Sequence, residues 1–140
     1  HELGHHVRWD VWKMMFVSTV LIFVSFFVID LALDEWIDSL GLRGISDIAG
    51  LPLVLIVGVG VSLVALPVSN WLSRRAETAA DLYALNLTGM RDEFISAMDK
   101  LGDKNLAQKE PNAFVEFVFH SHPSIQHRID NARAWTASNG

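Results

Sequence analysis

Two histidines and a glutamate at the start of the chain have the residue types and spacing of a zinc hydrolase motif. The first five residues are His1-Glu2-Leu3-Gly4-His5. On a helix, residues i and i+4 share a face, so His1 and His5 can direct their imidazoles to one metal ion. Glu2 lies beside them and can take a proton from a water that zinc has acidified. The pattern predicts a zinc-activated water that attacks a peptide carbonyl, with Glu2 as general base and then acid.

A catalytic zinc needs a third protein ligand, and the best candidate lies far along the chain. Arg8 and Val11 occupy the places where one common extension of the motif has a glycine and a third histidine. Glu77 and Asp81 form an i, i+4 pair among small alanines, which allow another helix to approach closely. One of these carboxylates can bind zinc while the other accepts the N–H of a ligand histidine. Spacing alone leaves open a second interpretation, a solvated helix face paired with neighbouring arginines.

Composition excludes several classes of protein. The chain has 140 residues, which suffice for one modest domain, and it contains no cysteine. Its 11 lysines and arginines and 16 aspartates and glutamates give a formal net charge of −5. These counts exclude thiolate metal sites and cysteine nucleophiles, and they argue against a nucleic-acid partner. Charged residues make up only 19% of the chain, below the ~25% of an average soluble domain. An ordinary soluble protein is therefore not expected.

Two long apolar stretches predict a pair of membrane helices. Residues 14–33 contain one acid, Asp30, and residues 49–72 contain no charged residue. Each stretch is long enough to cross the ~30 Å hydrocarbon layer of a bilayer as a helix. Basic residues flank the outer ends and acids are concentrated between the stretches, so both outer ends are expected in the cytoplasm. The alternative is a pair of buried core helices in a larger soluble protein.

The rest of the chain predicts short helices outside the membrane and no strand. Apolar spacing predicts a helix that ends at Gly89 and another that ends at Gly102. The expected elements are helices over residues 73–88, 91–101, 113–119 and 123–135, with a polar loop over 103–112.

The ordered motifs resemble one known family. The HELGH helix, two hydrophobic spans, the segment SRRAETAAD and the segment SHPSIQHRI are similar to those of the integral-membrane gluzincin proteases, which include the type I CAAX prenyl endopeptidases and the HtpX-type proteases. The resemblance covers essentially the whole chain. It implies an all-α, integral-membrane helical bundle with two transmembrane helices and a helical zinc-protease catalytic region. It also implies one zinc ion per chain, with Glu77 as third ligand beside His1 and His5, and Asp81 orienting a ligand histidine.

The closing motif supplies two further site residues. The resemblance assigns to His122 and Arg128 a role in binding substrate or stabilising the transition state, and a cationic side chain can stabilise the developing oxyanion. From the residues alone, His122 could instead cap a helix or lie at the surface, and Arg128 could simply pair with Asp81 or Glu77. Asn70 is a minor candidate for a hydrogen bond to backbone or to another helix. No site role is expected for the other histidines, His6, His120 and His127.

These observations predict a membrane-embedded zinc metalloendopeptidase similar to the CAAX prenyl proteases. The intervals between motifs and the apolar lead into SHPS favour that branch. An HtpX-like protease for membrane-protein quality control is one alternative. An inactive metal-binding scaffold is the other, and the intact Glu2 argues against it. Expected partners are the lipid bilayer and peptide or membrane-protein substrates, prenylated or not, with no nucleic acid.

Residues 1–140 are expected to be the C-terminal part of a single peptidase domain in a multi-pass membrane protein. The expected location is a bacterial inner membrane or the endoplasmic reticulum membrane, with the catalytic side in the cytoplasm. Family members have further spans before the HELGH helix, so the 140 residues alone are expected to be weak or inactive. The expected parts are a zinc-motif helix (1–13), transmembrane helices (14–33 and 49–72), a loop (34–48) and a soluble helical region (73–140).

Overall fold

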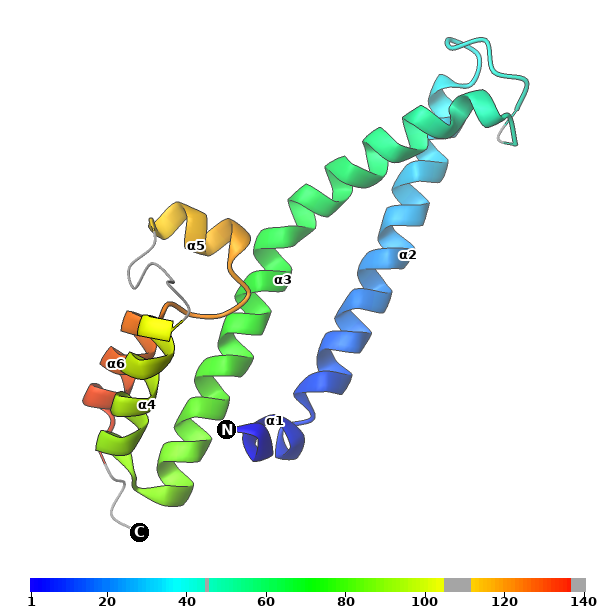
Figure 1. Cartoon of the computed structure of the whole chain (residues 1–140). Helices are drawn as coiled ribbons and strands as arrows, with labels where there is room; N and C mark the ends of the chain where they lie inside the picture. The colour runs from blue at the N-terminus through cyan, green and yellow to red at the C-terminus, as the bar shows by residue number, and fades with distance from the viewer. Residues whose placement is uncertain (45, 105–111, 137–140) are drawn as a thin grey trace. The chain divides into compact units, whose positions relative to one another are not determined.

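The computed structural model describes residues 1–44, 46–104 and 112–136, and every regular element in these ranges is a helix (Figure 1). The all-α prediction is therefore confirmed for the described residues. In chain order the elements are α1 (Glu2–Val7), α2 (Asp10–Trp36), the short 3-10 helix η1 (Ile48–Gly50), α3 (Leu51–Thr88), α4 (Arg91–Lys104), α5 (Ala113–Phe119) and α6 (Ile125–Ala134).

The chain divides into two compact units. One unit, called the site unit here, comprises His1–Met14 and Ser69–Gly140, and the other, called the hairpin unit, comprises Met15–Val68. The site unit is therefore discontinuous in sequence, because the whole hairpin unit lies between its two parts. Helices α2 and α3 each contribute residues to both units. The helix α3 is continuous from residue 51 to residue 88, so it crosses the boundary expected at residue 73 without a break.

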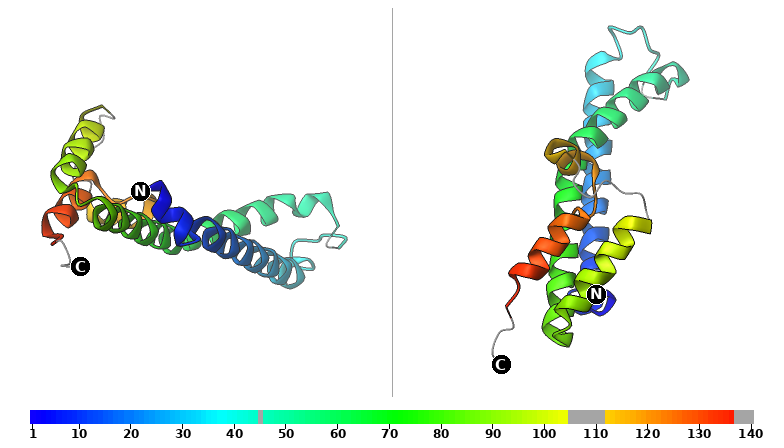
Figure 2. Two further views of the ribbon diagram at one scale, coloured as in Figure 1. Left: turned by 90° about the horizontal axis from the view of Figure 1, so that it is seen from below. Right: turned by 60° about the vertical axis from the view of Figure 1, so that its left-hand side comes forward.

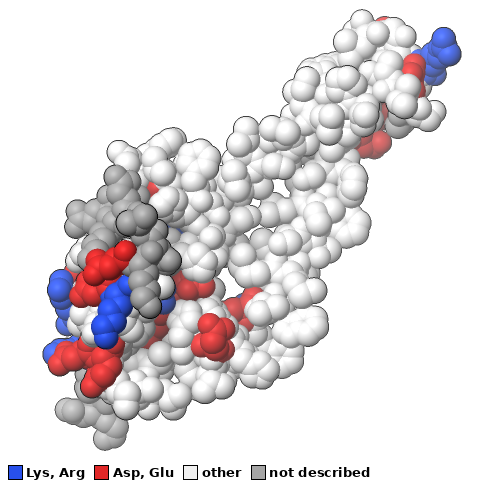
Figure 3. Space-filling view, viewed as in Figure 1, with Lys and Arg blue, Asp and Glu red and all other residues white. Residues whose placement is uncertain are grey.

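The hairpin unit exposes apolar helices. The stretches Asp10–Trp36 and Ile48–Thr88 are each long and apolar enough to cross a membrane, as predicted. Only 6% and 0% of their most apolar windows are buried inside the structure, whereas the core helix of a soluble protein buries most of its apolar side chains. Charged side chains gather over the site unit and near the loop between α2 and α3, and the visible faces of the helices in the hairpin unit are largely uncharged (Figure 3).

The loop that joins the two long helices is closed by a carboxylate. Asp47 accepts hydrogen bonds from the backbone N–H groups of Arg43 and Ala49, at 2.9 and 3.0 Å. These bonds favour the charged carboxylate, so they lower the pKa of Asp47 below its usual value. Leu42 and Leu33 pack against Gly50 at the start of α3. The loop therefore has its own small set of local contacts.

In the site unit, α4 packs along α6 (Figure 2). Ala80 and Leu85 of α3 and Ile129 and Ala132 of α6 are buried. Gly89 ends α3 with a φ of +67°, the left-handed conformation that glycine adopts most easily. The expected end of the next helix at Gly102 is wrong, because α4 continues to Lys104 and buries Gly102. Most of the loop expected over residues 103–112 lies outside the described residues.

Candidate metal centre

The helices α1 and α3 approach closely because each has a very small residue at the contact. A Cβ atom added to Gly4 would lie 2.9 Å from the Cα atom of Ala80 and 3.2 Å from its Cβ atom. Both residues are buried, Ala80 completely. The contact bears out the expectation that alanines near Glu77 allow a second helix to approach. It also explains why glycine occupies the fourth position of the HELGH motif, since any side chain there would force the two backbones apart.

His1, His5 and Glu77 each bring one potential ligand atom to a common point, and these atoms lie within 4.8 Å of one another. The Nε2 atom of His1 is 3.3 Å from Oε2 of Glu77, and Nε2 of His5 is 3.5 Å from Oε1. The two Nε2 atoms are 3.2 Å apart. Zinc bonds of ~2.0–2.1 Å in tetrahedral geometry would separate ligand atoms by ~3.3 Å. The donor set and its spacing therefore fit a zinc ion.

Each of these imidazoles is held by a buried aspartate on its other ring nitrogen. Nδ1 of His1 is 2.8 Å from Oδ1 of Asp81, and Nδ1 of His5 is 3.2 Å from Oδ2 of Asp10. Both aspartates are only 5% exposed. An ionised carboxylate can only accept, so each Nδ1 carries the hydrogen and each Nε2 keeps its lone pair for a metal. The sequence predicted such a role for Asp81 but missed Asp10.

Asp10 reaches His5 because the backbone turns between them. The HELGH helix α1 ends at Val7, and Trp9 has a φ of +60°, which is uncommon for a residue other than glycine. The turn separates α1 from α2, where a single helix over residues 1–13 was expected. Asp10 is consequently the first residue of α2 and points back at His5. A lone acid between the motif and the apolar stretch was the sequence signal that could have identified it.

Arg128 forms a bidentate ion pair with Asp81. Its Nε and Nη2 atoms donate to the two carboxylate oxygens at 2.8 and 2.6 Å. Burial disfavours the charge of the guanidinium, but the hydrogen bonds and negative charges of Asp81 and Glu77 outweigh it, so the pKa of Arg128 is raised. The pairing with Asp81 that the residues alone left open is therefore present in the structure. Through Asp81, Arg128 helps to hold the imidazole of His1.

A cavity of about 1210 Å³ opens beside the cluster and contains most of the predicted site residues. His122 lies at its edge, with Nδ1 3.3 Å from Oε1 of Glu77 and its side chain 64% exposed. Glu2 and Arg128 also line this cavity. One wall is apolar and comes largely from α4, which sequence reasoning did not connect with the site. The large apolar residues that line it are Phe94, Met98, Leu101, Phe119 and Ile125.

The segment that contains His122 is tied to α3 through the end of α5. Asn70 donates to the carbonyl of Val118 at 2.6 Å, which is the kind of hydrogen bond the sequence suggested. Arg74 donates to three carbonyls at the C-terminal end of α5, those of Glu116, Phe117 and His120. The carbonyl of Glu116 also accepts the backbone N–H of His120. Arg74 thus adds a second donor to that carbonyl and supplies a donor to the carbonyls of Phe117 and His120 at the end of the helix. The role of Arg74 was missed, since nothing in its sequence context distinguishes it from Arg75.

A helix with two histidines that meet a glutamate from a distant helix defines a metal-hydrolase type of centre. Residues 1–136 match the family model described as Peptidase family M48. The match covers nearly the whole chain, so the chain belongs to this family of peptidases. The resemblance to the membrane gluzincin proteases is thereby confirmed at the level of the family, and a protease with a metal cofactor is supported.

Three relatives illustrate the range of the similarity. The chain is 32% identical over 136 residues to the "uncharacterized metalloprotease YhfN" of Bacillus subtilis (strain 168), covering 94% of this chain and 32% of the relative. It is 28% identical over 144 residues to the "CAAX prenyl protease 1 homolog" of Caenorhabditis elegans, covering 99% and 32%. It is 31% identical over 149 residues to "Protease HtpX" of Xylella fastidiosa (strain 9a5c), covering 92% and 49%. The chain thus spans about a third to about a half of the length of these relatives. No solved structure matches it significantly.

Proposed function

We propose that this chain supplies the catalytic centre of a membrane-embedded, zinc-dependent endopeptidase. The observation that carries the proposal is the convergence of His1, His5 and Glu77, at zinc-like spacing, beside a cavity lined by Glu2. In this proposal the two imidazoles and the Glu77 carboxylate hold one zinc ion. When bound, zinc supplies a Lewis acid that lowers the pKa of a water molecule to near 7.

The protein's own groups move the proton and stabilise charge. The Glu2 carboxylate accepts a proton from the attacking water and returns it to the nitrogen of the leaving amine. Asp81 and Asp10 keep the Nδ1 hydrogens of His1 and His5 in place, which directs both Nε2 atoms to the metal. In this proposal the exposed imidazole of His122, which lies beside Glu77, donates to the carbonyl oxygen of the scissile bond as negative charge develops there.

The apolar wall of the cavity supports a substrate with bulky apolar groups. Phe94, Met98 and Leu101 of α4 offer a surface for large apolar side chains or for a prenyl chain. We propose a CAAX prenyl protease-like activity on this basis. Proteolysis of unprenylated membrane proteins is the second candidate, because relatives named "Protease HtpX" match nearly the same length of this chain. An inactive scaffold would have no use for a free glutamate at the position of Glu2.

The two apolar helices support a location in a membrane. Basic residues flank the outer ends of the apolar stretches and acids lie between them, so the catalytic side is proposed to face the cytoplasm. The lipid bilayer and an apolar peptide are the proposed partners.

Cleavage by the full-length protein, purified in detergent with zinc, tests this proposal. The substrates are a farnesylated CaaX peptide and the same peptide without the prenyl group, and the variants are Glu2→Gln and the control Glu93→Gln, which changes an exposed glutamate of α4. We expect Glu2→Gln to lose activity by about 10²–10⁴-fold while it retains its zinc, and Glu93→Gln to match wild type. The preferred peptide identifies the branch.

Two results would contradict the proposal. Undiminished cleavage by Glu2→Gln would remove the glutamate from the mechanism. Equal inactivity of wild type and Glu2→Gln on both peptides, with stoichiometric zinc in each, would favour the scaffold.

A further inference from the structure

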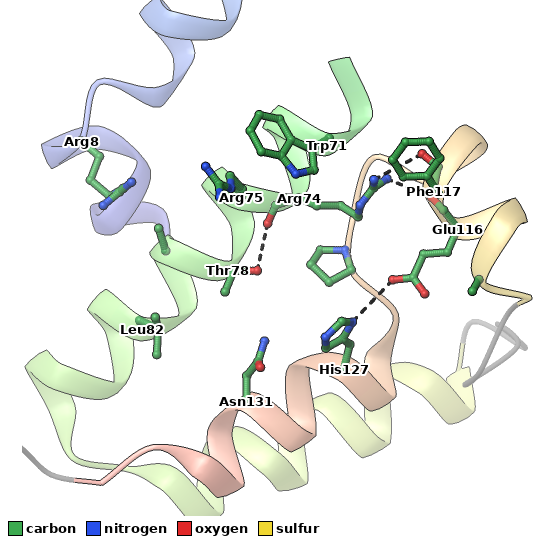
Figure 4. Close-up of a pocket in the computed structure, with 13 residues that line it drawn as sticks. Arg8, Trp71, Arg74, Arg75, Thr78, Leu82, Glu116, Phe117, His127 and Asn131 are labelled. Carbon is green, nitrogen blue, oxygen red and sulfur yellow. Dashed lines mark hydrogen bonds and ion pairs between the residues drawn. The ribbon is translucent and has the colours of Figure 1, made fainter. Parts of the chain in front are cut away.

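A second cavity lies on another face of α3, away from the metal centre. It has a volume of about 570 Å³, and α3 contributes to it the side chains of Trp71, Arg75, Thr78 and Leu82 (Figure 4). These residues recur at the three- and four-residue spacing of a single helical stripe. Glu77 lies on a different face of α3. The cavity and the candidate metal centre therefore use different side chains of the same helix.

The lining of this cavity is rich in positive charge. Three arginines line it, and Glu116 is its single carboxylate. Glu116 accepts the backbone N–H of Ser124 at 3.0 Å, so part of its charge is already used within the protein. The guanidinium of Arg74 is occupied by the carbonyls at the end of α5. The charges that remain for a ligand are those of Arg8 and Arg75.

Arg75 has donors available in a defined direction. Its guanidinium carbon lies 4.2 Å from the centre of the Trp71 ring. It makes no hydrogen bond or ion pair with another residue in the part of the chain that the structure describes. Stacking on an indole uses the face of the guanidinium and leaves the N–H groups at its edge free. A planar fork of donors in this state suits the oxygens of a phosphate or carboxylate.

Arg8 adds a second cation from another helix end. It follows α1 directly, its side chain is 43% exposed, and its Nε atom is 3.6 Å from Oδ2 of Asp10, beyond a hydrogen bond. The Oδ1 atom of Asp10 is also 3.6 Å from the Nζ atom of Lys13, and its Oδ2 atom accepts a hydrogen bond from His5. The single carboxylate of Asp10 thus has three partners, Arg8, Lys13 and His5. It neutralises only part of the positive charge of Arg8, and the rest can act on a ligand in the cavity.

The position of Trp71 on the chain indicates where this cavity lies relative to a bilayer. Trp71 is the last residue but one of the uncharged stretch over residues 49–72, and Arg75 follows one helical turn later. Tryptophan and arginine in this order are typical of the boundary between hydrocarbon and headgroups. Leu82 and Phe117 add apolar surface to the lining. The cavity therefore combines positive charge with apolar side chains. A ligand with an anionic head and apolar chains would match both.

We infer that this cavity binds the phosphate group of an anionic phospholipid, with Arg75 as the main contact and Arg8 as the second. The site does not depend on proteolysis, because none of the proposed metal ligands contributes to it. It would fix the headgroup of one lipid at the base of the α3 span.

Retention of lipid by the full-length protein tests the inference. The protein is reconstituted in nanodiscs with equal parts of phosphatidylglycerol and phosphatidylcholine, transferred to detergent, and its bound lipids are counted by native mass spectrometry. We expect wild type to retain phosphatidylglycerol selectively, and Arg75→Gln to lower that selectivity about fivefold. Arg75→Lys, which keeps the charge but loses the planar fork, should give an intermediate value. Arg133→Gln removes one exposed charge of α6 and should match wild type.

Zinc content and melting temperature, expected to be equal in wild type and Arg75→Gln, show that the variant is folded. Unchanged selectivity in folded Arg75→Gln overturns the inference, as would occur if another part of the protein covers the cavity. An equal loss in Arg133→Gln overturns it as well, because the effect would then be general surface charge. Complete displacement of the lipid by inorganic phosphate would assign the site to free phosphate and contradict the lipid source.

Discussion

The hairpin unit and the site unit place polar and apolar side chains in opposite ways. In the hairpin unit, large apolar side chains such as Phe23 and Val64 are 70% and 78% exposed. In the site unit, Asp10 and Asp81 are among the most buried residues, at 5% each. No buried side-chain nitrogen or oxygen of the described residues lacks a hydrogen-bond partner. The exposed apolar helices are suited to a lipid solvent, whereas the site unit buries carboxylates that are fully hydrogen-bonded.

The largest effect is expected where the site unit buries charge. Asp81→Asn leaves Arg128 without its ionic partner and weakens the hold on His1. Loss of one member of a buried pair costs about 3–5 kcal/mol of unfolding free energy, and loss of a carboxylate behind a ligand histidine weakens metal binding about 10–100-fold. Thermal unfolding in detergent and a competitive zinc titration measure the two effects.

Asp130→Asn is the matched control for this variant. Asp130 is 56% exposed and pairs with Arg133 on α6, so its change should alter the unfolding free energy by less than about 1 kcal/mol. Equal effects of the two aspartate variants would contradict the contrast between a buried and an exposed ion pair.

A charge in the middle of α2 tests the other side of the comparison. Phe23 is the central residue of α2, and Phe23→Lys is expected to make membrane insertion less favourable by about 3 kcal/mol. Leu87→Lys places the same charge on an exposed leucine of the site unit and should have little effect. The fraction of protein that resists carbonate extraction from membranes is the measurement. Full resistance of Phe23→Lys would mean that α2 does not face lipid at this position.

The smallest of the three effects compares two helical glycines. Gly4→Ala forces a Cβ atom against the backbone of Ala80, which we expect to cost about 1–3 kcal/mol and to lower activity. Gly60→Ala in α3 meets no atom within 4 Å, so it should leave stability unchanged or raise it by up to about 1 kcal/mol. Melting temperatures of the two variants in the same detergent give the comparison. A stable, active Gly4→Ala would show that the close approach of α1 and α3 is dispensable.

Much of the fold and the pairing of His1 with His5 followed from local spacing in the sequence, whereas the choice of Glu77 as the third ligand depended on the resemblance to a family. His1 and His5 lie one helical turn apart, as do Glu77 and Asp81, and apolar length alone identifies the two long helices. Trp9 shows where such reasoning ends. Its residue type gives no sign of a left-handed backbone, and the placement of Asp10 depends on that turn.

The apolar wall of the cavity could not be predicted from the sequence for a related reason. Phe94 and Met98 have the spacing of an ordinary amphipathic helix, and only the path of the chain after Gly89 brings α4 to the cavity beside His1, His5 and Glu77. Arg74 likewise differs from Arg75 only through its hydrogen bonds to the carbonyls at the end of α5, which lie 42 to 46 positions further along the chain. These contacts are tertiary, and no short-range pattern encodes them.

The split of the site unit by the hairpin unit has a consequence for biosynthesis. The ribosome makes His5 first, then both apolar helices, and Glu77 only 72 residues later. A nascent chain that has not yet completed the second apolar helix therefore offers a metal two imidazoles and no carboxylate from α3. If the proposed ligands bind the metal, all three are present together only after both apolar stretches have been synthesised. The order of the segments along the chain thus makes the proposed metal centre one of the last features to be completed during synthesis.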